Sequence, residues 1–196
     1  MVEKNKHFEI HPWEPYIPKD AKIIFLGTFP PKAQKWGMNF YYPNKINDFW
    51  RILGKIFHGD YSHFIDKETN LFNKEKIIAT LDLHKIAIAD IAVKVYRQKD
   101  NASDKYLEII DTLDLIGVLS KTPSCKYIVA TGQKSAETIA MITDTVVPKI
   151  GDSTKASINN HEIKIYRMPS TSRAYPLAID KKTELYHQLF FNTEIL

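Results

Sequence analysis

Four short apolar runs, each closed by a polar residue, glycine or proline, limit the possible folds of this chain more than any other feature. They lie at 22–27, 85–90, 126–131 and 162–168. Each run is short and rich in β-branched or aromatic residues, which is typical of strands buried on both faces of a parallel sheet. The sequence therefore predicts a central sheet with four main parallel strands.

The stretches between these runs carry apolar residues at spacings of three and four, as amphipathic helices do. We expect helices at 46–57, 73–81, 104–119, 135–142 and 181–191. The third has a natural N-cap in Ser103 and a break near position 111. Strands that alternate with helices predict a three-layer α/β/α sandwich with right-handed crossovers. We expect one domain over 1–196, with a proline-rich arm at 1–20 packed across it.

Composition narrows the class of protein without naming a partner. No run approaches the roughly 20 apolar residues that a membrane helix needs, and the polar start is unlike a signal peptide. The single cysteine, Cys125, cannot form an internal disulfide and has no CxxC companion. The net charge of +4 suits contact with phosphate groups, although a lysine-rich solvated surface has the same balance. We expect a cytoplasmic monomer without cofactor, metal or membrane contact.

The carboxyl ends of the expected strands are where a ligand should bind, because parallel α/β sheets place their sites there. The segments at these ends are 27–31, 90–104, 131–135 and 168–175. In the first, Gly27-Thr-Phe-Pro-Pro31, glycine and two prolines stiffen a loop whose amides can point at a ligand. A structural turn without a ligand is the alternative.

Two further motifs follow this loop, and a third lies late in the chain. They are Phe40-Tyr-Tyr-Pro43, Asn47-Asp-Phe-Trp50 and Met168-Pro-Ser-Thr-Ser-Arg-Ala174. With Gly27–Pro31, and in this order and spacing, they resemble the uracil-DNA glycosylase superfamily over roughly 21–190. Within this superfamily, the motifs most resemble those of the hypoxanthine-DNA glycosylase and mismatch-specific branches. There, a Gly-x-Phe-Pro or Gly-x-Asn-Pro loop precedes an aromatic run and Asn-x-Phe-Trp. Asp90-Ile-Ala92, Ser103-Asp104 and Thr131-Gly132 are also similar to their counterparts.

The resemblance implies a DNA glycosylase of base excision repair. Such an enzyme flips a deaminated base, here hypoxanthine or uracil, out of DNA and hydrolyses its N-glycosidic bond. Two alternatives stay open: a DNA-binding relative with weak or lost catalysis, and an α/β enzyme that acts on a free nucleotide. The single cysteine excludes the iron–sulfur branch of the superfamily. His58 and His63 match no common zinc spacing.

The base-binding residues implied by the resemblance lie in the first loop, the aromatic run and the ends of two later strands. They are Gly27, Thr28, Phe29, Phe40, Tyr41, Tyr42, Thr131 and Met168. Counting back from Asn47 favours Tyr42 as the ring on which the base stacks, and counting forward from Phe29 favours Tyr41. One or two of the three consecutive aromatic residues could instead fill the core.

For catalysis the resemblance points to Asn47. Better-known branches carry a catalytic Asp or Asn in the first loop, where this chain has Phe29, which cannot orient water. In the Gly-x-Phe-Pro branch, the asparagine of Asn-x-Phe-Trp takes this role. Asp48, beside it, is a second candidate to hold water. The alternative for Asn47 is a helix N-cap.

The late loop is expected to hold the DNA backbone through amides, hydroxyls and charge. The residues concerned are Pro169, Ser170, Thr171, Ser172, Arg173 and, from the segment after the third strand, Lys134. A turn that opens the last helix is the alternative. Thr131 and Met168 stand where the strongest uracil enzymes have asparagine and histidine. This leaves the excised base open and predicts slow catalysis.

Overall fold

The computed structural model describes residues 7–98, 104–158 and 160–196. Its central sheet has five strands in the order β3-β2-β6-β8-β7. They are β2 (Ile23–Gly27), β3 (Ile86–Asp90), β6 (Tyr127–Ala130), β7 (Ser153–Ile158) and β8 (His161–Arg167). The four strands expected from the sequence are neighbours and run parallel.

The fifth strand corrects the prediction of a four-stranded parallel sheet. β7 pairs antiparallel with β8 at the edge, so the sheet is mixed. Its sequence, Ser-Thr-Lys-Ala-Ser-Ile, buries only Ala156 and Ile158. An edge strand with one solvated side does not produce the continuous apolar run that identified the other four.

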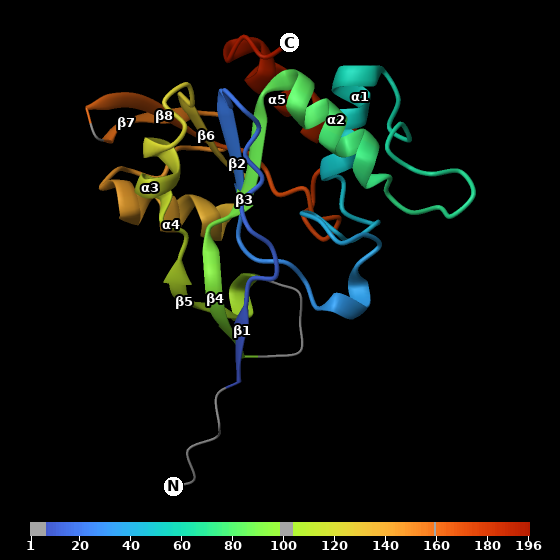
Figure 1. Ribbon diagram of the computed structural model, residues 1–196, viewed down its shortest axis with the longest axis horizontal. Helices are drawn as coiled ribbons and strands as arrows, with labels where there is room; N and C mark the ends of the chain where they lie inside the picture. Colours follow the sequence, from blue (N-terminus) through green and yellow to red (C-terminus); the bar gives the residue numbers. More distant parts are fainter. Residues whose placement is uncertain (1–6, 99–103, 159) are drawn as a thin grey trace, which may run out of the picture.

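Four of the five expected helices are confirmed within a few residues. The helices are α1 (Phe49–His58), α2 (Lys74–His84), α3 (Leu115–Ser120), α4 (Gln133–Thr143) and α5 (Ile179–Asn192), with short 3-10 turns η1 (Ala33–Lys35) and η2 (Asp104–Tyr106). Figure 1 shows α1, α2 and α5 on one side of the sheet and α3 and α4 on the other. The expected three-layer arrangement is therefore present. Within the described ranges, no helix is long and apolar enough to cross a membrane.

A second, three-stranded antiparallel sheet was not predicted. It has the order β1-β4-β5, with β1 (Phe8–Ile10), β4 (Ala92–Arg97) and β5 (Leu107–Thr112). The predicted helix over 104–119 is thus wrong in its first half. Leu107 is buried with Ala92 and Val95, and the partly buried Phe29 and Ile109 pack against this cluster. Pairing with β4 and burial in this cluster therefore make 107–112 a strand rather than a helix. The Ser103 cap lies outside the described residues.

The main core lies around β2 and the helices that cover it. Phe25 of β2 lies against Phe49 of α1 and Phe190 of α5, with both pairs of ring centroids 5.6 Å apart. These rings, Trp50 and Tyr186 are almost completely buried. The packing fixes where α1 begins, and with it the position of the Asn47–Trp50 motif at the carboxyl end of β2.

The carboxyl ends of the parallel strands meet at one edge of the sheet. In the register, Gly27 lies beside Asp90, Leu26 beside Ala130, and Ala130 beside Arg167. β4 starts two residues after β3 ends, so the small sheet lies next to this edge, and β1 runs along β4 (Figure 1). The arm before β2 therefore passes the place where a ligand is expected.

Candidate active site

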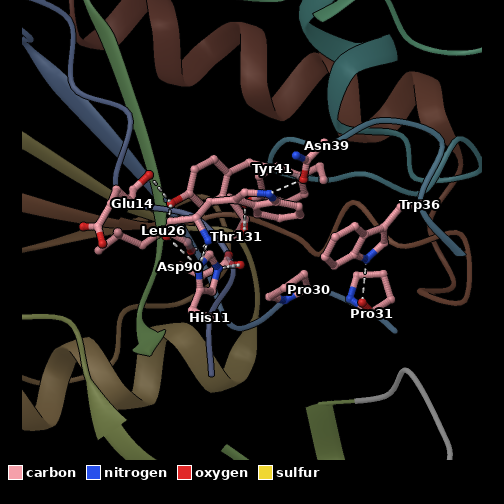
Figure 2. A network of polar contacts seen from close by, with 12 residues as sticks. His11, Glu14, Leu26, Pro30, Pro31, Trp36, Asn39, Tyr41, Asp90 and Thr131 are labelled. Atoms are coloured by element: carbon pink, nitrogen blue, oxygen red, sulfur yellow. Dashed lines mark hydrogen bonds and ion pairs between the residues drawn. The ribbon is translucent and has the colours of Figure 1, made fainter. Parts of the chain in front are cut away.

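A compact polar cluster lies at the carboxyl ends of β2, β3 and β6. The Tyr42 hydroxyl and Thr131 Oγ1 are 2.6 Å apart, and Thr131 Oγ1 lies 3.3 Å from the Leu26 carbonyl (Figure 2 shows Leu26 and Thr131). Because Thr131 donates to that carbonyl, Tyr42 donates to Thr131. The two hydroxyls thus form a short fixed chain at the strand ends.

Gly27 allows the Asp90 carboxylate to enter this cluster. A Cβ atom at position 27 would lie 2.2 Å from Asp90 Oδ1 and 3.1 Å from the Tyr42 hydroxyl. The first of these distances is far below any real carbon–oxygen contact, so a larger residue would displace Asp90. The glycine predicted as base-binding therefore owes its place at least partly to this close approach.

Tyr42 is held in an unusual conformation. Its φ is +49°, in the left-handed region, and its ring stacks on Phe49 with centroids 4.0 Å apart and planes 15° apart. Burial, followed by the nearby Asp90 charge, raises the pKa of Tyr42 well above its ordinary value. The hydroxyl stays neutral and can donate a hydrogen bond. Since Phe49 covers one face of the ring, a flipped base could stack only on the other.

The other two residues of the aromatic run are core residues. Phe40 stacks on Trp50 with centroids 6.1 Å apart and lies under the Lys74 ammonium. Tyr41 is 1% exposed and donates from its hydroxyl to the Glu14 carbonyl at 3.0 Å. Neither joins the polar cluster. The structure thus favours Tyr42 over Tyr41 among the two positions that counting along the sequence left open.

Thr28 and Phe29 leave the first loop in different directions. Thr28 donates from its hydroxyl to Asp104 at 2.8 Å. Burial, with a smaller effect from Asp90, raises the pKa of the Asp104 carboxyl. Phe29 packs against the small sheet and lies under the Arg97 guanidinium. Thr28 therefore joins the polar edge, whereas Phe29 is a packing residue between the two sheets.

Asn47 and Asp48 meet different surroundings at the start of α1. Asn47 Oδ1 accepts a hydrogen bond from the Phe49 amide at 2.9 Å, so the side chain does help the chain enter the helix. Its Nδ2 has no partner among the described residues and is free to hold water.

Asp48 is buried and bound by two cations: Lys182 Nζ lies 2.9 Å from Oδ2, and Arg173 Nε lies 3.1 Å from Oδ1. Each carboxylate oxygen of Asp48 is therefore already engaged by a cation, so Asp48 joins the start of α1 to the late loop and α5.

The late loop is tied to α1 and α5 by its backbone. The Thr171 carbonyl accepts from the Asp48 amide at 2.9 Å, and the Ser172 carbonyl accepts from Lys182 Nζ at 2.9 Å. Ser170 Oγ and Ser172 Oγ accept from backbone amides two residues on, as in the turn that was the alternative reading of this loop. Arg173 projects from the loop with half of its side chain exposed.

The remaining predicted residues surround this loop. Met168 is buried and donates from its amide to the Ala130 carbonyl at 2.8 Å. Pro169 is buried, and its carbonyl accepts from the Tyr186 hydroxyl at 3.1 Å. Lys134 is half-buried in the first turn of α4, and its charge partly offsets the rise that burial causes in the pKa of Asp104. Met168 and Pro169 are thus packing residues at the strand ends, and Lys134 adds positive charge there.

Two residues of the cluster were absent from the predicted site. Asp90 lies at a strand end, which is the signal that could have selected it. His11 lies in the arm before the first central strand and reaches Asp90 across 79 positions of sequence, with Nε2 3.0 Å from Oδ2 (Figure 2). No local pattern in the sequence indicates that contact.

No group of three or more His, Cys, Asp or Glu side chains in 7–98, 104–158 and 160–196 is placed to hold a metal ion. His58 and His63 stack on one another with centroids 3.6 Å apart, and His58 Nε2 contacts Thr80 Oγ1 at 3.0 Å. These two histidines therefore form a packing contact on α1 and the loop after it.

Comparison with known proteins gives the class of fold first. The solution NMR structure of a protein from Methanosarcina acetivorans, provisionally named a uracil DNA glycosylase, matches with a TM-score of 0.62 and 18% identity. The match covers 96% of this chain and 99% of that one. The fold is therefore uracil-DNA glycosylase-like.

A sequence relative adds a second, separate likeness. The chain is 26% identical to the hypoxanthine DNA glycosylase of Methanosarcina barkeri (strain Fusaro / DSM 804) over 124 residues, which are 63% of this chain and 71% of the relative. No protein-family model matches the sequence. Fold and sequence together support the resemblance to the uracil-DNA glycosylase superfamily.

Proposed function

We propose that this protein is a DNA glycosylase that excises a deaminated base, hypoxanthine or uracil, from DNA. The observation that carries the proposal is the similarity to a hypoxanthine DNA glycosylase in a chain with the corresponding fold. The strand-end cluster supports it, because it offers an aromatic ring, neutral hydroxyls and a carboxylate at one place. Enzymes that act on a flipped base combine stacking with hydrogen bonds to the base edge.

Each part of the cluster has a place in this reaction. The face of Tyr42 opposite Phe49 would stack on the base, and the Thr131 hydroxyl and the amides of the 27–31 loop would face the base edge. The Asn47 amide would hold the attacking water. The amides would also stabilise the negative charge that develops on the departing base. We propose that Asp48 acts indirectly, by anchoring Arg173 and the late loop.

The proposed DNA-backbone surface consists of the 169–173 loop and Lys134. Lys32, which follows the 27–31 loop in the sequence, is a further candidate. We expect DNA binding to weaken steeply between low and physiological salt. When lysine and arginine side chains bind DNA phosphates, they displace counterions, and added salt opposes this release.

Arg173→Gln should weaken binding to all sequences alike and reduce the salt dependence. Fluorescence anisotropy at several salt concentrations measures both effects. The exposed Lys155, which lies on the edge strand β7 outside the proposed surface, provides the control substitution Lys155→Gln.

One assay tests the function directly. Purified protein is incubated with labelled oligonucleotides that carry uracil, hypoxanthine, xanthine or ethenocytosine, in single- and double-stranded form, and abasic sites are cleaved with alkali. Cleavage at hypoxanthine or uracil is the expected result. Salt-dependent binding without any cleavage would instead favour the non-catalytic relative. Hydrolysis of free nucleotides would favour the third hypothesis. We propose further that the enzyme acts as a monomer in the cytoplasm.

A further inference from the structure

His11 is a buried imidazole delivered to the strand ends from the arm before β2. Its side chain is 5% exposed, and Nε2 lies 3.0 Å from Asp90 Oδ2, whose side chain is 9% exposed. An ionised carboxylate only accepts hydrogen bonds, so Nε2 carries the proton that joins the two groups. The pair lies beside the first loop, as Figure 2 shows.

The imidazole cannot turn away from Asp90. Its Nδ1 faces the Trp13 backbone, 2.8 Å from the carbonyl oxygen and 3.2 Å from the amide nitrogen. One face of the ring lies against Tyr41, with planes 24° apart, and Phe29 meets it at 87° with centroids 5.4 Å apart. The Trp13 backbone, Tyr41 and Phe29 therefore fix the imidazole ring on three sides. The fixed ring holds its Nε2–H in one direction, and this hydrogen bond orients the Asp90 carboxylate.

The fixed carboxylate presents its second oxygen to the site. Asp90 Oδ1 lies over Gly27, next to the Tyr42 hydroxyl, and has no hydrogen-bond partner in the part of the chain that the structure describes. The other carboxylates nearby are engaged differently. Asp48 has a cation on each oxygen, and Asp104 accepts from the Thr28 hydroxyl through Oδ2. Asp90 thus combines one oxygen fixed by His11 with a second oxygen that faces Gly27 and the Tyr42 hydroxyl.

We propose, on the basis of the proposed glycosylase function, that Asp90 is a catalytic residue that accepts a proton from the attacking water, and that His11 is its positioning residue. The C1′–N bond breaks with its electron pair on the base, and the water oxygen bonds to C1′. One water proton passes to Asp90 and then to solvent, and the departing base takes one proton from solvent. The Asn47 amide can hold this water but cannot accept its proton.

The test compares His11→Leu, which removes the donor, with His11→Gln, whose Nε2 can still donate to Asp90. Single-turnover excision on the preferred base of the wild type should fall by roughly tenfold or more in His11→Leu, as when orienting partners are lost. DNA affinity should stay unchanged, and His11→Gln should recover most of the rate. His187→Leu, at an exposed position on α5, is the control. Thermal melts correct each rate for the folded fraction.

A double-mutant cycle separates positioning from a structural effect. Asp90→Asn alone should lose about a hundredfold in rate, in the range typical of general-base catalysis. Adding His11→Leu to Asp90→Asn should lower the rate no further, because both changes affect one group. Additive losses, a His11→Leu enzyme of wild-type rate, or losses explained by the unfolded fraction would each overturn the inference while the glycosylase function stands. A wild type that excises no base overturns the function and this inference together.

Discussion

Asn47→Ala is expected to slow base excision by about a hundredfold or more, with DNA affinity nearly unchanged, because a positioned polar group that activates water contributes roughly this much. The structure leaves the Asn47 amide nitrogen available at the start of α1, while its oxygen accepts from the Phe49 amide. Single-turnover excision of hypoxanthine and uracil, measured beside DNA binding, gives the result. A rate effect of this size cannot come from loss of the hydrogen bond to the Phe49 amide alone.

Asn44→Ala is the matched control for this substitution. Asn44 also accepts from an amide two residues on, that of Ile46 at 3.1 Å, but it lies outside the proposed site. Each alanine variant should lower the free energy of unfolding by about 1 kcal/mol or less through the lost turn. Only Asn47→Ala should also lose activity. A fully active Asn47→Ala protein would contradict the role of Asn47 and leave Asp90 as the group that activates water.

Lys182→Met is expected to lower the free energy of unfolding by about 3–5 kcal/mol, the usual cost of removing one partner of a buried ion pair. Lys182 is 1% exposed, and its ammonium contacts both Asp48 Oδ2 and the Ser172 carbonyl at 2.9 Å. Without the lysine, Asp48 loses its buried cation and keeps the ion pair with the half-exposed Arg173. Urea denaturation measures the loss, and its midpoint should fall without a large change in slope.

The neighbouring Lys181 provides the control. It is 65% exposed and pairs with Glu184 one turn on, so Lys181→Met should leave the free energy of unfolding nearly unchanged. Asp48→Asn combined with Lys182→Met should recover part of the loss, because no unpaired charge remains buried. A loss below about 1 kcal/mol in Lys182→Met would show that water or a rearranged Arg173 replaces the lysine.

Local pattern was sufficient for the central architecture. The runs that became β2, β3, β6 and β8 are apolar along their whole length because both faces of a parallel sheet are covered. Four helices were predicted from their apolar spacing, because each helix is buried on one side. β7 and β5 were not predicted, because each forms a strand only through pairing with its partner strand. β7 is half-solvated against β8, and β5 has a spacing that fits a helix equally well until it pairs with β4.

The candidate site divides in the same way. The first loop, the Asn47–Trp50 motif and the late loop are continuous segments, so their residue order carries the resemblance without any knowledge of distances. The sequence by itself determined the parallel sheet, the helices over it and the strand ends as the expected place for a ligand, because these depend on periodicity within a segment. Only the tertiary structure decided that Tyr42 rather than Tyr41 joins the polar cluster at the strand ends, that Asp48 is bound by Lys182, and that His11 contacts Asp90. The Asp48–Lys182 and His11–Asp90 contacts join residues 134 and 79 positions apart, and such contacts depend on how the packed layers bring distant segments together.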